Sequence, residues 1–118
     1  MRIDRAEFGS ITIDGTTYAH DVVIKTSGEV IKRKKKLSKF YHGASHKVSK
    51  DEAKFLCEQG CPRLIIGTGC YGGVRISREA VSYFERIGCK VVAKPTPEAV
   101  RLYNESTGIR AALFHVMG

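Results

Sequence analysis

The feature that most constrains the fold of this chain is a threefold alternation of helix signals with short apolar runs in residues 49–118. Each helix signal is a residue that favours a helix N-terminus, and each helix is predicted to end at a glycine. The caps are Ser49, Ser77 and Thr96, and the glycines are Gly60, Gly88 and Gly108. Apolar runs follow at residues 64–66, 90–93 and 109–116, and they predict strands covered on both faces. Repeated helix–strand units predict an α/β core.

Two of the caps make more detailed predictions. Ser49 and Glu52 have the spacing of a capping box, in which the glutamate side chain reaches back to the serine amide. Thr96 precedes Pro97, so its hydroxyl is predicted to accept a hydrogen bond from the backbone of Glu98 or Ala99.

Two further residues of the last helix–strand unit are interpreted, with Thr96, as architectural. Asn104 lies in mid-helix, where asparagine is a poor helix former, so we expect it to hydrogen-bond outside its own helix. Arg110 begins an apolar strand and needs a carboxylate or carbonyl partner, or a route to solvent. The alternative is that Asn104 and Arg110 converge on a cleft and hold a substrate.

The N-terminal residues 1–31 carry a different pattern. Ile11 and Ile13 alternate with polar residues, and the pair Asp14-Gly15 predicts a two-residue hairpin turn before the next short strand. These residues predict an antiparallel meander. The whole chain, residues 1–118, is therefore predicted to be a single three-layer α/β domain with a mixed central sheet, in which residues 32–48 form a long basic loop.

A glycine-rich stretch, IIGTGCYGG, follows the first predicted strand of the core. Gly67, Gly69 and Gly72 match the G-x-G-x-x-G spacing of dinucleotide-binding loops. The next cap, however, is Ser77, too far along for a helix N-terminus to meet a pyrophosphate, and the following strand ends in Lys94 rather than an acidic residue. We therefore expect no dinucleotide and no other cofactor.

A weaker prediction for the same loop concerns anions. Loops at the carboxyl end of a central strand bind ligands in open α/β sheets, and exposed amides form anion nests. The candidate residues are Gly67, Thr68, Gly69, Gly72, Gly73, Arg75 and Lys94. The competing interpretation is a connector that needs glycine for its backbone angles.

The net charge of +8 comes from one segment, because residues 32–50 hold eight basic residues and no acidic one. Its candidate phosphate contacts are Lys32, Arg33, Lys34, Lys35, Lys36 and Lys39, with Phe40 and Tyr41 beside them. We expect any nucleic-acid binding to be weak and non-specific, and a solvated loop is the alternative.

The spacing of the cysteines favours a protein without a metal site. The four cysteines form no C-x-x-C pair, so no metal site is predicted, and buried thiols are favoured over a Cys57–Cys61 disulfide.

Amide side chains are scarce, because Gln59 and Asn104 are the only ones, and such scarcity is typical of thermophilic proteins. Without a long apolar run or leader, the chain is expected to be cytoplasmic and to have no membrane span.

Five segments together resemble a family of largely uncharacterised α/β domains that includes the mitochondrial complex I assembly factor 3 and the adipogenesis-associated domain protein. They are FGSITIDGTTY, PRLIIGTG, VSYFERIGCKVV, TPEAVRLYNE and GIRAALFHV. The resemblance implies a three-layer fold with a mixed sheet, no established catalytic residues, and action through protein partners. The lysine run departs from the family pattern.

The sequence thus favours a non-enzymatic domain that acts through protein contact, in the manner of an assembly factor, with no catalytic residue assigned. The first alternative is a small-ligand or anion-binding protein, with or without catalysis, that uses residues 67–75. The second is weak nucleic-acid binding through residues 32–39.

Overall fold

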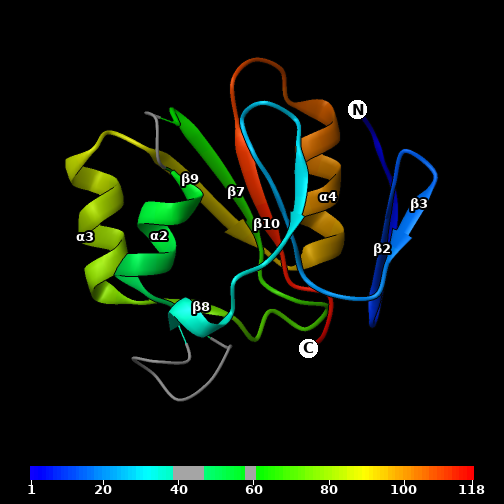
Figure 1. Cartoon of the computed structure of the whole chain (residues 1–118), viewed down its shortest axis with the longest axis horizontal. Coiled ribbons are helices and arrows are strands. Elements are labelled where there is room, and N and C mark those ends of the chain that lie inside the picture. The colour runs from blue at the N-terminus through cyan, green and yellow to red at the C-terminus, as the bar shows by residue number, and fades with distance from the viewer. Residues whose placement is uncertain (39–46, 58–60) are drawn as a thin grey trace.

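The computed structural model describes residues 1–38, 47–57 and 61–118 (Figure 1). Its main sheet has five strands in the order β5-β4-β10-β7-β9. Strands β7, β9 and β10 are parallel, whereas β4 is antiparallel to β5 and β10, so the sheet is mixed as predicted. The strands are β4 (Val22–Ile24), β5 (Val30–Lys32), β7 (Arg63–Gly67), β9 (Lys90–Lys94) and β10 (Ala111–Phe114).

Helices cover both faces of this sheet. Helices α2 (Lys50–Leu56) and α3 (Arg78–Arg86) lie over one face, and α4 (Thr96–Glu105) lies over the other (Figure 1). Consecutive residues of β7 point to opposite faces, because Leu64 and Ile66 join one core cluster and Ile65 joins the other. The predicted three-layer α/β fold is confirmed.

The N-terminal meander is also confirmed. Strands β1 (Ile3–Glu7), β2 (Ser10–Ile13) and β3 (Thr16–Tyr18) form a separate antiparallel sheet beside α4. Asp14 and Gly15 both have positive φ angles, 48° and 81°, as the predicted hairpin turn requires. The last two strands of the predicted meander, β4 and β5, extend the main sheet.

The helix caps Ser49 and Ser77 are confirmed, since the two hydroxyls accept from the amides of Glu52 and Ala80, each across 3.1 Å. The second half of the predicted capping box is wrong. The carboxylate of Glu52 is buried against Arg33, and the amide of Ser49 donates to the hydroxyl of Ser38 instead. Helix α2 ends at Leu56, before the predicted Gly60, which lies outside the described residues.

Two further expectations need correction. Strand β9 is an edge strand whose residues are half-buried or exposed, so its apolar run is covered less completely than predicted, although α3 and α4 contact it from opposite faces. The basic segment 32–48 is not one loop, because Lys32 belongs to β5 and residues 36–38 are helical. Its far end forms β6 (Lys47–Val48), which pairs with β8 (Arg75–Ile76). In the described part of the chain, no helix has the length and apolar character that crossing a membrane needs.

Candidate functional site

The glycine-rich loop connects the end of β7 to β8 and lies against the start of α4. The amide of Gly69 donates to the hydroxyl of Thr96 across 2.8 Å, and the amide of Thr96 donates back to the carbonyl of Gly69 across 2.9 Å. The Thr96 hydroxyl in turn donates to the carbonyl oxygen of His115, which follows β10, across 2.7 Å. The loop, α4 and the end of β10 are therefore joined at one side chain.

Close neighbours require glycine at three positions of this loop, 67, 69 and 73, and a Cβ atom on Gly73 would lie 2.6 Å from the carbonyl oxygen of Gly118. A Cβ atom on Gly67 would lie 2.8 Å from the Phe114 ring and 2.9 Å from the Thr96 hydroxyl. Gly69 has a φ of +105°, and a Cβ there would lie 2.7 Å from the backbone of Met117 and Gly118. The spacing that resembles a nucleotide motif therefore has a packing cause in this fold.

Most amides of the loop donate within the chain. Those of Thr68, Gly69, Cys70, Gly72, Gly73 and Val74 bond to acceptors in β9, α4, the loop itself and the C-terminal residues. An anion nest needs amides that point at a ligand, so this arrangement leaves little for an anion to bind. The side chains of Arg75 and Lys94 are exposed beside the loop. Anion binding and the expected absence of a dinucleotide stay predictions.

The predicted role of Thr96 as a helix N-cap is wrong. The cap position is Pro95, no side chain caps α4, and Thr96 is the fully buried first residue of the helix. Its hydroxyl makes tertiary hydrogen bonds instead, and its importance for architecture rather than catalysis stays a prediction.

Asn104 and Arg110 both have hydrogen-bond partners within the chain. Asn104 bonds to both backbone groups of Ile3, accepting across 3.0 Å and donating across 2.8 Å, which confirms a partner outside its own helix. Arg110 donates to the carbonyls of Gly108 and Tyr103 and lies 4.1 Å above the Tyr103 ring. Carbonyl partners for Arg110 are thus confirmed.

A buried ionic network that sequence patterns did not predict connects Asp21, Arg33, Glu52 and His115. Arg33 donates to the carboxylates of Glu52, across 2.7 Å and 3.0 Å, and of Asp21, across 3.0 Å. Asp21 also lies 2.7 Å from Nδ1 of His115 and accepts from the amide of Val116. The network joins residues just before β4, just after β5 and just after β10 to helix α2, so it fixes the helical layer to the sheet.

The charges of this network depend on one another. Burial alone would raise the pKa of Asp21, but hydrogen bonds from His115, the Val116 amide and Arg33 outweigh it and lower the pKa to about 2. Burial likewise opposes the charge of Arg33, but Glu52 and Asp21 raise its pKa above the ordinary value. Both groups therefore stay ionised in the folded protein.

The burial of Arg33 removes it from the candidate residues for nucleic-acid binding. The side chain of Arg33 is 0% exposed and cannot reach a phosphate, so its assignment was wrong. Lys32, Lys34 and Lys36 are exposed and Lys35 is half-buried, whereas Lys39, Phe40 and Tyr41 lie outside the described residues. Lys34 lies over the ring of Phe55, 4.6 Å from its centre.

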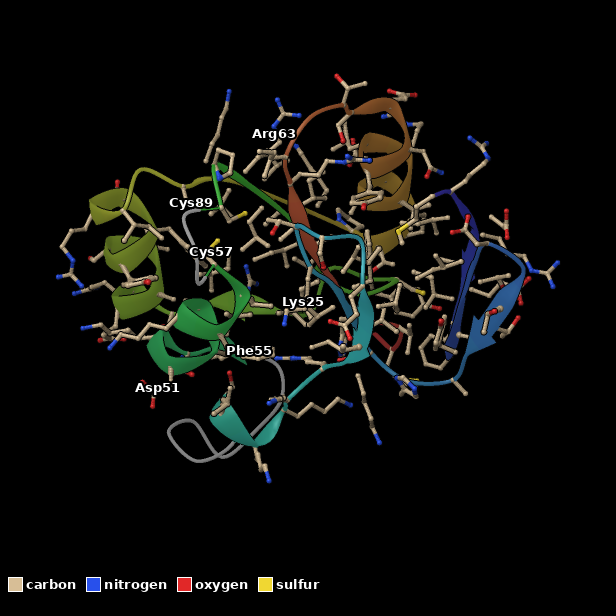
Figure 2. All side chains as sticks on the ribbon, turned by 45° about the horizontal axis from the view of Figure 1, so that its top comes forward. Lys25, Asp51, Phe55, Cys57, Arg63 and Cys89 are labelled. Carbon is tan, nitrogen blue, oxygen red and sulfur yellow. The ribbon has the colours of Figure 1, made fainter. Side chains whose placement is uncertain are left out.

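Two shallow hollows adjoin the start of the basic segment. One, of about 550 Å³, is lined by Lys34, Leu37, Asp51, Lys54, Phe55 and Tyr83. The other, of about 250 Å³, shares Tyr83 and adds Lys50, Arg78, Glu79, Ser82 and Arg86. Figure 2 shows Phe55 and Asp51 on α2, at the side of the molecule away from the β1–β3 sheet. Cations and aromatic rings thus alternate on this face, with two acidic groups among them.

An exposed aromatic patch, defined here as Phe8, Tyr71 and Met117, lies where the β1–β2 turn meets the glycine loop. Tyr71 is 82% exposed, Phe8 57% and Met117 45%. The Phe8 and Tyr71 rings are 6.1 Å apart between centres. The backbone fixes this grouping, because Gly9 donates to Val116 and Cys70 donates to Met117. Sequence patterns did not predict the patch, because its members come from three distant segments.

A thiol cluster, defined here as Cys57, Cys61 and Cys89, lies in the core between the helical layer and the sheet. Its sulfur atoms all lie within 4.8 Å of one another, and 3.2 Å separates the sulfur of Cys57 from that of Cys89. The sequence offered a Cys57–Cys61 disulfide as the alternative, but all four cysteines are free.

Comparison with known proteins places the chain in a family. Residues 3–114 match a family described as "Protein of unknown function (DUF498/DUF598)". The chain belongs to this family. The uncharacterised α/β family predicted from the sequence is therefore confirmed at that level, and no curated protein matches the chain.

Solved structures share the fold of this family member over nearly its full length. A conserved hypothetical protein from Pyrococcus horikoshii OT3 is 35% identical over 100% of both chains, with a TM-score of 0.92. The structure named MT938 is 29% identical over 99% of this chain and 98% of its own, with a TM-score of 0.85. A protein from Bordetella parapertussis, at 17% identity, covers 98% and 94% with a TM-score of 0.74 and shows the fold alone.

Proposed function

We propose that this protein acts by contacting a protein partner through the aromatic patch. The observation that carries this proposal is the exposure of Phe8, Tyr71 and Met117 together, although they come from separate segments. Single exposed apolar residues are ordinary on protein surfaces, but a contiguous group marks an interaction site. Aromatic residues and methionine are also the types enriched at protein interfaces.

The charges beside the patch indicate the chemistry of the partner. Arg75 and Lys94 are exposed, and neither forms an ion pair within the described part of the chain. A partner that places apolar side chains over Tyr71 and acidic groups opposite these two cations would complement this surface.

The sequence resemblance to the complex I assembly factor 3 supports the same mode of action, because it implies contact with proteins rather than catalysis. A cytoplasmic location stays a prediction from the sequence. The glycine loop then serves to present Tyr71 and to hold the C-terminal residues, rather than to bind a cofactor.

Photo-crosslinking in the native cell tests this proposal. A photoreactive phenylalanine analogue at position 71 should capture a defined protein, and the adduct should be lost when Phe8→Ser is added. The matched control places the analogue at position 109, because Ile109 is 67% exposed elsewhere on the surface. Identical adducts from positions 71 and 109, or capture unaffected by Phe8→Ser, would contradict the proposed surface.

A second candidate function is weak nucleic-acid binding at the two hollows. The alternation of Lys34, Phe55 and Lys54 in the larger hollow supports phosphate contact beside aromatic rings. Asp51 and Glu79 line the same surface, and cations already cover the faces of Phe55 and Tyr83, so base stacking has less support.

A further inference from the structure

We propose that Cys57, Cys61 and Cys89 bind one thiophilic divalent cation of the zinc class. The three residues come from two connections of the fold, α2–β7 for Cys57 and Cys61 and α3–β9 for Cys89. Cys57 is the C-cap of α2, Cys61 precedes β7, and Cys89 lies between α3 and β9. Figure 2 shows Cys57 and Cys89 at the same end of the sheet as Arg63, the first residue of β7. The cluster is thus at the opposite end of β7 from the glycine loop.

The sulfur positions fit a shared cation. Zinc binds thiolates at about 2.3 Å, which places sulfur atoms about 3.8 to 4.0 Å apart in tetrahedral or trigonal geometry. The sulfur atoms of Cys57 and Cys89 are 3.2 Å apart, and all three sulfur atoms lie within 4.8 Å of one another. Shifts below about 1 Å would equalise these distances, and side-chain rotation alone supplies shifts of that size.

The ligand type selects the class of metal. All three donors are sulfur, and soft thiolate ligands favour zinc and related thiophilic ions over magnesium or calcium. Charge favours a divalent ion, because three thiolates around it leave a net charge of −1, whereas a monovalent ion would leave −2 in an apolar core. Binding releases the thiol protons to solvent, with no change of oxidation state.

The pKa values of the three thiols shift in different directions. The hydrogen bond to Cys89 and burial raise the pKa of Cys57, and burial raises the pKa of Cys61. The hydrogen bond from Cys57 lowers the pKa of Cys89 in spite of burial.

Cadmium titration of the reduced, metal-free protein under anaerobic conditions tests the site. Cadmium is the probe because its bonds to thiolates absorb in the ultraviolet, whereas zinc is silent. We expect the absorption to rise to a plateau at one equivalent of cadmium and the melting temperature to rise with it. Cys57→Ser, Cys61→Ser and Cys89→Ser should each weaken binding at least about tenfold.

Cys70→Ser is the matched control, because Cys70 is the fourth cysteine of the chain and lies outside the cluster, in the glycine loop. It should keep the plateau and the melting shift of the wild type. If the core variants fail to fold, the wild type and Cys70→Ser still decide the question. Absorption that never saturates near one equivalent would overturn the proposal. A Cys57–Cys89 disulfide in protein from the native cell would do so as well, because it would consume two ligands.

Discussion

The hydroxyl of Thr96 lies 2.7 Å from the carbonyl oxygen of His115 and 2.8 Å from the amide nitrogen of Gly69. One buried side chain thus satisfies two backbone groups from different elements. Thr96→Val keeps the shape of the side chain and leaves both groups without their partner. We expect it to lower the free energy of unfolding by about 2 to 4 kcal/mol in urea titrations.

Thr96→Ser keeps the hydroxyl and should cost less than half as much as Thr96→Val. A Thr96→Val variant as stable as the wild type would show that the two backbone groups find other partners.

Asp21 should make stability depend on pH in the acid range. Its pKa falls from 3.8 to about 2 on folding, so the unfolded chain takes up the proton first as the pH is lowered. The stabilisation is fully present above about pH 4 and is lost as the pH falls through 2. One pKa unit corresponds to about 1.4 kcal/mol, so the loss should be about 2 kcal/mol.

The measurement is urea unfolding at intervals from pH 5 to pH 2. Asp21→Asn removes the titrating group and should flatten the curve in that window, although it lowers stability at every pH. Glu29→Gln is the control, because Glu29 is exposed and pairs only weakly with Lys25, and it should leave the curve unchanged. Equal slopes for the wild type and Asp21→Asn would contradict the assignment.

Gly69→Ala should be more destabilising than alanine at another glycine with a positive φ angle. The left-handed backbone alone costs about 1 to 2 kcal/mol for a residue with a Cβ atom. At Gly69 that atom would also lie 2.7 Å from the backbone of Met117 and Gly118. Gly108→Ala is the matched control, because Gly108 has a φ of +87° and open space around its Cα.

Thermal or urea unfolding of both variants separates backbone strain from overlap. The difference between them should exceed about 1 kcal/mol. Equal losses would mean that the C-terminal residues move aside without cost and do not hold the loop.

Duplex DNA binding, where present, should depend on salt with a modest slope. Burial of Arg33 leaves four basic residues in the run 32–36, which gives a slope of log affinity against log salt near −3 to −4. Lys34→Ala should reduce the slope by about 1 in anisotropy titrations. Lys90→Ala, an exposed lysine on β9, should leave it unchanged. Sequence-selective binding below micromolar Kd at physiological salt would contradict this prediction.

Local sequence signals were enough to predict the helix caps and the hairpin turn, because the causes of these features are local. Ser77 and Ser49 cap helices through amides three residues away, and Asp14-Gly15 adopts the turn that its own backbone freedom favours. Repetition of such signals was sufficient to predict a three-layer fold. It was not sufficient to show that β9 lies at the sheet edge, since strand order depends on pairing between distant segments.

The roles of the individual side chains depend on contacts between distant segments. Arg33 belongs to a lysine-rich run, yet it is buried because Asp21, just before β4, and Glu52, in α2, provide two carboxylates that compensate its desolvation. Thr96 has the sequence context of a helix N-cap, but its hydroxyl forms hydrogen bonds with two backbone groups from other elements instead. Burial and hydrogen bonding depend on which distant residues meet, and a linear pattern does not contain those distances.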